Sequence, residues 1–558
     1  MSTAYKLLLC LALTPLMGAA DPGAGLPPTA ICHTEAKPDP TLPAKALLRG
    51  YGTGGFAITT TNPEAQAYFD NGMQLAHAFA HGAATAAFKR AEELDPTCAM
   101  CVWGEAWSRG PNLNFTIEPA DQAELLALTK KAAALAAHNP ATKQWMGEQA
   151  LIAALALRYQ DGGGKGPGDY AYARAMDAIA TAAPADNELA IMAADGWMIP
   201  ASHKASRNHL DRAIALLETV LARAPNDTGA IHFYIHATEN DGVAAKALPY
   251  AMRLQALAPA ASHLTHMPSH TYFWVGRYRA AEQANLDAVE IDKANAVRLN
   301  TKGGVFGLAY HAHNVMYGEG SALMDGDGAA AMVLAKAQLT QLVDAPANNA
   351  FFQWSLGHAY MVFGRYGTDA EVAGLADPGA KQPLLQAMRH YALGEAAARR
   401  GDVAEVKAQA AAIQIDPAGM KTFKDGDAAT AQALLDVARG VLTGRAAMLQ
   451  KDWASAEAAY RQAADIQEAR LNGFADPPIW WCPVRRSLAA ALMADGKPQA
   501  AAAEARKAMI HCPYDPVSLR VLADSEMAGG DKAGAARDLA YARSGWVGAA
   551  GTTPAALE

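Results

Sequence analysis

Alanine recurs every 34 residues in the middle of this chain, at Ala213, Ala247 and Ala281. After each of the first two alanines, alanine or a larger apolar residue follows at the fourth and seventh places, and a proline follows at the twelfth. Small residues at fixed places allow two antiparallel helices to pack closely, and a proline ends the second helix before the next unit begins. Such a unit cannot bury its apolar face alone, so the spacing predicts helical hairpins that stack into a solenoid.

This spacing, which we call the repeat frame, recurs near both ends of the chain. It is found at Ala84, Phe88, Ala91 and Pro96 and again at Ala501, Ala505, Ala508 and Pro513. Trp103, Gly104 and Trp107 have the spacing of a repeat's first helix. This pattern resembles the tetratricopeptide repeat (TPR). The resemblance implies an all-α fold, a right-handed superhelical solenoid of helix-turn-helix TPR-like repeats, from about residue 68 to about residue 540. The longer step from Ala281 to Ala331 predicts an insertion near residues 295–304.

Composition and periodicity divide the 558 residues into five segments. They are a signal peptide (1–20), an extended leader rich in proline and glycine (21–66), N-terminal TPR-like repeats that carry a histidine cluster (67–300), C-terminal TPR-like repeats (301–545) and a tail (546–558). The leader has little helical periodicity, so we expect it to pack as an extended segment along the first repeats.

The first twenty residues have the order of a secretory signal, with Lys6, an apolar run from Leu7 to Leu16, and small residues that end at Ala20. We therefore expect cleavage after Ala20 and a periplasmic or secreted mature protein. No later apolar stretch reaches the roughly 18 to 20 residues that a membrane span needs. A net charge of -8 without a long basic run argues against nucleic acid as a partner.

Eight of the sixteen histidines fall between His232 and His358. His232, His236 and Glu239 have the spacing of one helical face, and so do His263, His266 and His270. The pairs His232/His236 and His266/His270 are also 34 residues apart, so the repeat copies one face onto the next unit. The TPR resemblance implies that these positions line the concave groove of the solenoid. Pro268 weakens the second stripe, because the helix could begin only near Met267 and leave His263 on a loop.

Two stripes that face one cavity could hold one or two transition-metal ions. The predicted ligands are His232, His236, His263, His266, His270 and Glu239, with His311, His313 and His358 as possible additional ligands. Ligation dominated by histidine suits copper first, and zinc or iron next. Two other interpretations stay open, since a polar groove for a peptide and a structural hydrogen-bond network would use the same side chains.

The cysteines are expected to form disulfides, because export permits them. Cys98 and Cys101 precede a predicted helix, and we favour a local disulfide there over a redox pair or two soft metal ligands. Cys482 and Cys512 lie at the start of one predicted helix and the end of its partner, so we predict a second bridge between them. This pairing leaves Cys32 as the odd thiol.

The chain also resembles large exported or cytosolic bacterial TPR proteins that carry Cys-Ala-Met-Cys-x-Trp-Gly and His-Met-Pro-Ser-His segments, found here at residues 98–104 and 266–270. No activity follows from this resemblance, and the sequence lacks hydrolase, zincin and dinucleotide-binding motifs. Our first hypothesis is a metal-binding solenoid, which would catalyse an oxidase-type reaction if it is an enzyme. The alternative is a non-catalytic scaffold that binds a peptide, protein or small molecule in the same groove.

Overall fold

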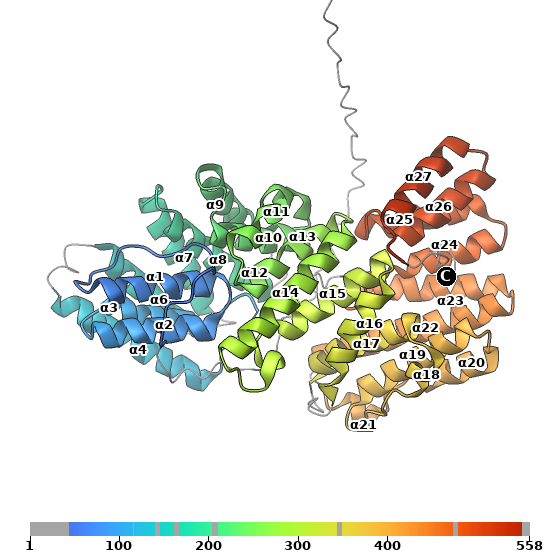
Figure 1. The fold of residues 1–558 in the computed structure, drawn as a ribbon, viewed down its shortest axis with the longest axis horizontal. Helices are drawn as coiled ribbons and strands as arrows, with labels where there is room; N and C mark the ends of the chain where they lie inside the picture. The colour runs from blue at the N-terminus through green and yellow to red at the C-terminus, as the bar shows by residue number, and fades with distance from the viewer. Residues whose placement is uncertain are drawn as a thin grey trace, which may run out of the picture.

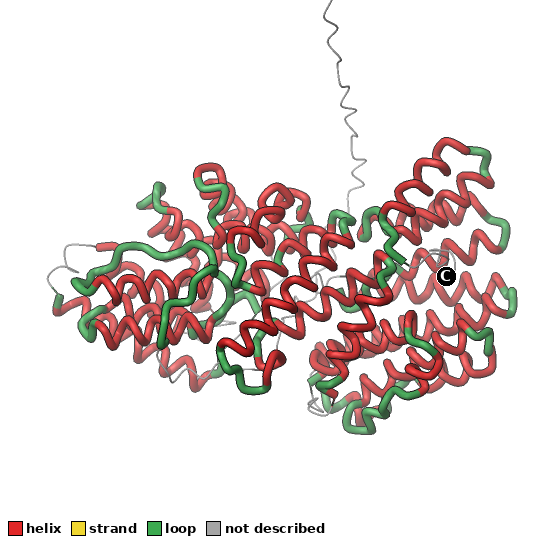
Figure 2. The backbone as a smooth tube through the Cα atoms, viewed as in Figure 1, coloured by secondary structure: helices red, strands yellow, loops and turns green. Residues whose placement is uncertain are grey.

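The computed structural model describes residues 44–114, 117–139, 146–160, 167–203, 210–342, 349–423, 425–472 and 478–548. Within these residues the chain is helical and contains no β-strand (Figure 2). The predicted signal peptide, Cys32 and most of the predicted tail lie outside the described residues. None of the described helices is both long enough and apolar enough to cross a lipid bilayer.

The helices follow one another along an elongated array, which runs from the N-terminal half on the left of Figure 1 to the C-terminal half on the right. The N-terminal half contains α1 (Pro63–His77), α2 (His81–Leu94), α3 (Ala99–Ser108), α4 (Pro119–His138), α6 (Met146–Gln160), α7 (Pro167–Ala182), α8 (Asn187–His203), α9 (Leu210–Arg223), α10 (Thr228–Asn240), η2 (Ala244–Ala247), α11 (Leu248–Leu257), α12 (Ser262–His266), α13 (Pro268–Trp274) and α14 (Tyr278–Arg298).

The C-terminal half continues in the same manner. It contains η3 (Gly304–Gly307), α15 (His311–Asp325), α16 (Gly328–Leu339), α17 (Ala350–Tyr366), α18 (Asp369–Ala373), α19 (Pro383–Arg399), α20 (Val403–Ala412), α21 (Pro417–Met420), α22 (Asp425–Leu449), α23 (Trp453–Ile466), η5 (Gln467–Leu471), α24 (Val484–Ala494), α25 (Pro498–His511), α26 (Pro516–Ala528) and α27 (Lys532–Ser544).

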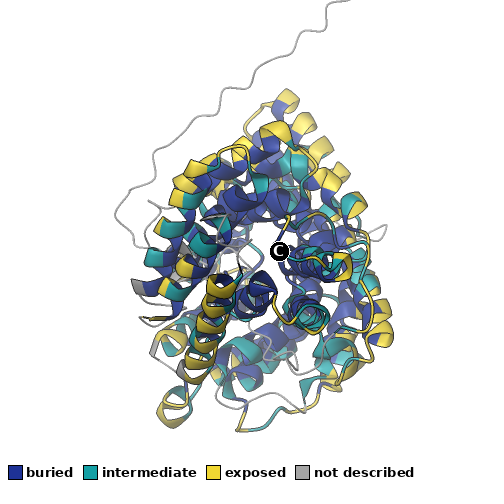
Figure 3. Cartoon of the chain, turned by 90° about the vertical axis from the view of Figure 1, so that its left-hand side faces the viewer, coloured by how far each residue is buried: buried dark blue, intermediate teal, exposed yellow. Residues whose placement is uncertain are grey.

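Neighbouring helices pack as hairpins, and each hairpin packs on the next one, as in α1 with α2, α2 with α3, and α24 with α25 and α26. The alanines of the repeat frame explain this closeness, since Ala84, Ala213, Ala247, Ala281 and Ala501 are all fully buried. Exposed residues gather on the outer faces of the helices, whereas the inner faces are buried (Figure 3). The predicted all-α solenoid of TPR-like helix pairs is therefore confirmed.

The apolar interior is divided between two large clusters of side chains. The first runs from Tyr51 to Met267 and also includes Tyr310, and the second runs from Phe273 to Cys512. Helices α12 to α15 join the two clusters near the middle of Figure 1. The predicted histidine cluster therefore lies where the two halves of the solenoid meet. The domain boundary proposed at residue 300 stays a prediction.

The predicted insertion corresponds to an extended helix and an irregular turn. Helix α14 is 21 residues long and ends at Arg298. Asn300, Gly303 and Gly304 then adopt positive φ angles of 49°, 84° and 66° before η3 and α15 begin. This irregular segment places α15 beside α14, and α15 contributes His313 to the cluster.

The described part of the leader crosses the first repeats as an irregular segment. The Leu48 backbone N–H donates to Asn71 Oδ1 at 2.9 Å, and the Thr53 backbone N–H donates to Thr228 Oγ1 at 2.8 Å. The Ala260 N–H donates to the carbonyl of Gly50 at 2.9 Å. The segment therefore ties α1 to the helices that carry the histidine stripes.

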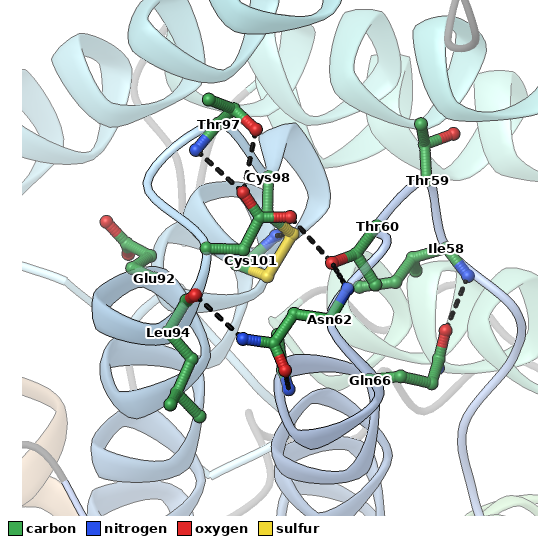
Figure 4. Close-up of a disulfide and its surroundings, with 12 residues drawn as sticks. Ile58, Thr59, Thr60, Asn62, Gln66, Glu92, Leu94, Thr97, Cys98 and Cys101 are labelled. Carbon is green, nitrogen blue, oxygen red and sulfur yellow. Dashed lines mark hydrogen bonds between the residues drawn. A yellow bond between two sulfur atoms is a disulfide. The ribbon is translucent and has the colours of Figure 1, made fainter.

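The Cys98–Cys101 disulfide forms as predicted, with an S–S distance of 2.08 Å. Cys98 is the N-cap residue of α3, and Asn62 at the start of α1 donates to the carbonyl of Leu94 at 2.9 Å (Figure 4). Cys482 and Cys512, in contrast, are free thiols. The predicted second bridge is therefore wrong, although both cysteines pack on the second apolar cluster, where Cys482 also lines a cavity.

Candidate metal centre

Helix α10 presents the first predicted stripe. Asp227 caps this helix, and its side chain accepts a hydrogen bond from the Ala230 N–H at 3.0 Å. His232, His236 and Glu239 follow on one face of α10, and each is at most 5% exposed. The stripe predicted from the spacing therefore points into the protein rather than toward solvent.

Helices α12 and α13 present the second stripe. Met267, between them, keeps right-handed helical backbone angles, and Pro268 takes the first position of α13, where its missing N–H costs nothing. His263 lies inside α12 and not on a loop, so Pro268 does not break the stripe. His263, His266 and His270 are at most 4% exposed.

The two stripes and α15 converge on one buried cluster. Three groups of side chains each bring their possible ligand atoms within 4.8 Å of one another, namely His232/His236/His263, His266/His270/His313 and His236/Glu239/His270. All six residues predicted as ligands belong to these groups, and His313, predicted as a possible addition, completes the second. These buried groups could hold a metal ion, since ligands near 2.0 to 2.1 Å from a tetrahedral ion lie about 3.4 Å apart.

In the first group, hydrogen bonding fixes the orientation of His232. Its Nδ1 lies 2.6 Å from the carbonyl oxygen of His77, which can only accept, so Nδ1 carries the proton. The unprotonated Nε2 of His232 therefore faces Nε2 of His263 at 3.1 Å. Nδ1 of His263 is buried and has no hydrogen-bond partner among the described residues.

In the second group, hydrogen bonds fix the orientation of two histidines, His266 and His270. Nδ1 of His266 lies 2.6 Å from Oδ1 of Asn285, whose amide nitrogen donates to the Ala281 carbonyl at 2.7 Å, so His266 must donate from Nδ1. Nδ1 of His270 donates to Glu239 Oε2 at 2.7 Å. When both rings are neutral, each presents an unprotonated Nε2, and these two atoms are only 2.7 Å apart. Their lone pairs repel each other unless a bound cation, or a proton shared between the two rings, lies between them.

Glu239 acts mainly as an orienting group in this arrangement. Its Oε2 accepts from His270, and its Oε1 accepts from Trp274 Nε1 at 2.7 Å. A carboxylate on the far nitrogen of an imidazole is the usual outer-shell partner of a metal-bound histidine, and it fixes the tautomer and raises the basicity of the ligating nitrogen. Glu239 also lies in the third group, within reach of a shared ion.

Burial keeps five of the imidazoles neutral. It lowers the pKa of His232 to about 3, although the hydrogen bond to the His77 carbonyl opposes this shift. Burial, reinforced by the neighbouring imidazoles, also lowers the pKa of His236, His263, His266 and His313 well below the usual value. Neutral imidazole is the form that binds metal ions, so the site is prepared for ligation at physiological pH.

Aromatic rings enclose the cluster on two sides. The Phe79 ring lies 4.4 Å from the His232 ring and stacks on His263 at 5.1 Å between centroids. Phe79 has a φ of 53°, an unfavourable backbone angle for a bulky residue, and such strain is typical of functional sites. On the other side, the Tyr317 ring stacks on His270 at 4.5 Å. These rings exclude water from the imidazoles.

Two further predicted candidates lie outside the cluster. His311 donates from Nδ1 to the buried carboxylate of Asp292 at 3.0 Å and packs against Phe306. His358 accepts a hydrogen bond from Trp481 Nε1 at its Nδ1, at 2.9 Å. Neither belongs to a group with ligand geometry among the described residues, which favours a structural role for both over metal ligation.

Several residues that shape the site were not predicted to do so. Asn285 orients His266, the His77 carbonyl orients His232, and Phe79 and Tyr317 cover the rings. Asn285 is four residues after Ala281, so the repeat frame places it on the buried face of α14, but nothing in the sequence pairs it with a histidine. The His77 contribution comes from the backbone and leaves no sequence signal.

The burial of the cluster also bears on the alternative interpretations. A peptide in a groove needs side chains that it can reach, and the six predicted residues are at most 5% exposed. A structural network stays open, because a proton shared between His266 and His270 would also join the two rings. This burial favours a metal site over a peptide groove, and the binding of a peptide, protein or small molecule in the same groove stays a prediction.

Comparison with known proteins gives no evidence about the function of this chain. No protein-family model and no curated protein matches the chain in sequence. Among solved structures, the chain is similar to human IFIT1 dimer with m7Gppp-AAAA (12% identity, 80% of this chain and 89% of that chain, TM-score 0.31). It is also similar to the P58(IPK) TPR domain (13%, 60% and 89%, TM-score 0.20) and to yeast Tom70 (9%, 85% and 90%, TM-score 0.29). At these scores the likeness carries no argument about function.

Proposed function

We propose that this protein binds one or two transition-metal ions, copper foremost and zinc or iron next, in the buried histidine centre between the two halves of the solenoid. The main support for this proposal is the contact between Nε2 of His266 and Nε2 of His270. Both rings donate from Nδ1 and are buried, so their facing Nε2 atoms need a positive charge between them, and a bound metal ion would supply it.

The arrangement suits two ions better than one. His232, His236 and His263 form one set of three imidazoles, and the second set consists of His266, His270 and His313. Each set supplies three nitrogen ligands and leaves coordination positions free, as in metal sites that carry out chemistry. Copper or iron bound in this way would supply oxygen chemistry, so we propose an oxidase-type oxidoreductase as the activity.

The chain's own residues would orient and protect such a centre. The His77 carbonyl, Asn285 and Glu239 hold the Nδ1 protons of His232, His266 and His270 and thereby direct each Nε2 inward. Phe79 and Tyr317 keep water from the rings. We further propose that the protein is exported, supported by its N-terminal sequence and by the Cys98–Cys101 disulfide, which suits an oxidising compartment.

Elemental analysis of the untagged protein tests the proposal. We expect up to two equivalents of copper, zinc or iron after reconstitution, and loss of both in a His232→Ala/His266→Ala double variant. His138→Ala is the matched control, because His138 lies exposed at the end of α4. Wild-type protein with intact helicity that takes up none of the three metals would contradict the proposal.

A further inference from the structure

A small cavity in the C-terminal half lies away from the histidine centre, and its lining is rich in arginine. It has a volume of about 40 Å³ and is bordered by Arg365 of α17, Arg445 of α22 and Arg486 of α24. Glu395 of α19 is the one acidic residue in its described lining. The cavity walls therefore carry an excess of positive charge.

Two of the three guanidinium groups already have carboxylate partners. Arg445 Nε lies 3.3 Å from Glu395 Oε1. Arg486 Nη1 lies 3.1 Å from Asp515 Oδ1, and both members of this pair are almost fully buried. These ion pairs engage Glu395 and Asp515, and no carboxylate forms an ion pair with Arg365 among the described residues.

Arg365 is the unmatched cation. Its Nε and Nη2 atoms are buried and have no hydrogen-bond partner among the described residues. Burial raises the pKa of the Tyr366 phenol, although the charge of Arg365 and a side-chain hydrogen bond with it oppose this shift. The phenol therefore stays neutral and supplies no counter-charge to Arg365. A buried donor without an acceptor costs free energy, and a buried charged donor costs more, so this group is suited to an external anion.

The two unpartnered nitrogens define the shape of that anion. Nε and Nη2 lie on the same edge of the planar guanidinium and donate two parallel hydrogen bonds, the geometry that matches the two oxygens of a carboxylate. From this edge and the unpaired charge, we propose that the cavity binds the carboxylate of a small organic acid, with Arg365 as the bidentate contact.

The rest of the cavity fits the remainder of such a molecule. Met361, Tyr391 and Trp480 line it, and the rings of Tyr391 and Trp480 pack edge to face with centroids 5.3 Å apart. One water needs roughly 10 to 15 Å³ of such space, so the cavity holds about three waters or a carboxylate with a short apolar stem. Arg445 and Arg486 are already paired, so the single free charge favours a monocarboxylate over a dianionic phosphate.

Titration calorimetry with propionate, acetate and inorganic phosphate tests this assignment. We expect wild-type protein to bind one propionate, to bind acetate more weakly, and to bind phosphate more weakly than propionate. Arg365→Gln should weaken propionate binding at least tenfold. Arg365→Lys should give an intermediate loss, because it keeps the charge but not the two parallel donors.

The controls separate this site from the histidine centre and from unfolding. Arg543→Gln, at an exposed arginine of α27, should bind propionate as wild type does. The His232→Ala/His266→Ala double variant should also bind propionate unchanged, whereas it would lose a carboxylate that was held by a metal ion in the histidine centre. Folded wild-type protein that binds no propionate, unchanged binding in Arg365→Gln, or tighter binding of phosphate than propionate would each overturn the assignment.

Discussion

The side-chain oxygen of Asn285 lies 2.6 Å from Nδ1 of His266, although the two residues come from different helices. The Asn285 amide nitrogen donates to the Ala281 carbonyl, so this oxygen is held in place by its own helix. One side chain of α14 thereby decides which nitrogen of His266 is available to a metal. Partners of this kind affect metal affinity without contacting the ion.

Replacing Asn285 should weaken metal binding while leaving the ligands in place. Asn285→Leu removes the acceptor, so His266 can rotate or change tautomer, and we expect metal affinity to fall roughly 10- to 100-fold. Competition with a chelator of known affinity measures the change. Gln283→Ala, at an exposed position of the same helix, is the control. Equal affinities of Asn285→Leu and wild type would show that this contact is not functional.

The Phe79 ring should control how fast a metal enters and leaves the first histidine group. Phe79→Ala removes the ring that covers His232 and His263 but no ligand. We expect the stoichiometry to stay the same and the rate of metal loss to a chelator to rise several-fold, followed by stopped-flow absorbance. An unchanged rate would mean that metal ions reach the group by another path.

The neighbouring histidines of α15 should differ in their effects. His313→Ala removes a nitrogen from the second group, so the metal content should fall. His311→Ala should leave the metal content unchanged but lower the free energy of unfolding by about 2 to 3 kcal/mol, because buried Asp292 loses a donor. Elemental analysis and thermal unfolding of both variants test the contrast. A loss of metal in His311→Ala would contradict the assignment of His311 as structural.

His358 should make stability depend on pH. Burial lowers the pKa of its imidazole to about 3, below the value near 6.5 of the unfolded chain. Between these values the unfolded chain binds a proton that the folded chain does not, so this contribution to stability is lost as the pH falls below 6.5. By pH 5 the loss is about 2 kcal/mol.

A His358→Gln variant isolates that contribution. It should melt below wild type at pH 7, because it loses the hydrogen bond from Trp481. The difference in melting temperature should shrink at pH 5, where wild type alone bears the penalty. His138→Gln at an exposed site should show no such narrowing. A difference that stays constant between the two pH values would refute the lowered pKa.

Gly320 of α15 should tolerate no side chain. A Cβ atom there would lie 2.0 Å from Cδ2 of Trp481. We expect Gly320→Ala to cost about 1 to 3 kcal/mol or more, since the indole is fully buried and cannot move aside. Gly426→Ala, in α22 with open space around the glycine, should be neutral or slightly stabilising. Thermal unfolding compares the two, and equal melting temperatures would contradict the packing described.

The solenoid and the two stripes were predictable because each depends on local periodicity. The spacing of His232 and His236 sets one face of α10, and the 34-residue frame repeats it at His266 and His270. Which of His311 and His313 joins the histidine cluster could not be predicted from this periodicity. Helix α15 follows the irregular segment after α14, so the frame no longer fixes its register.

The cysteines also show that only local pairing could be predicted from the sequence. Cys98 and Cys101 are joined within one turn, where local geometry is enough to predict the bond. Cys482 and Cys512 lie at the ends of paired helices, and the position of a backbone does not fix the direction of a thiol. Cys482 lines the cavity beside Arg365 instead.

The sequence by itself determined which residues share a helical face, because the α-helix turns through a fixed angle at each residue. The tertiary structure alone decided that the imidazoles of α10, α12, α13 and α15 point to one place. It also decided that Asn285 and Glu239 accept hydrogen bonds from Nδ1 of His266 and of His270. The reason is that a hydrogen bond or a metal bond requires placement within a few tenths of an ångström. Only the packing of helices distant in sequence sets such positions.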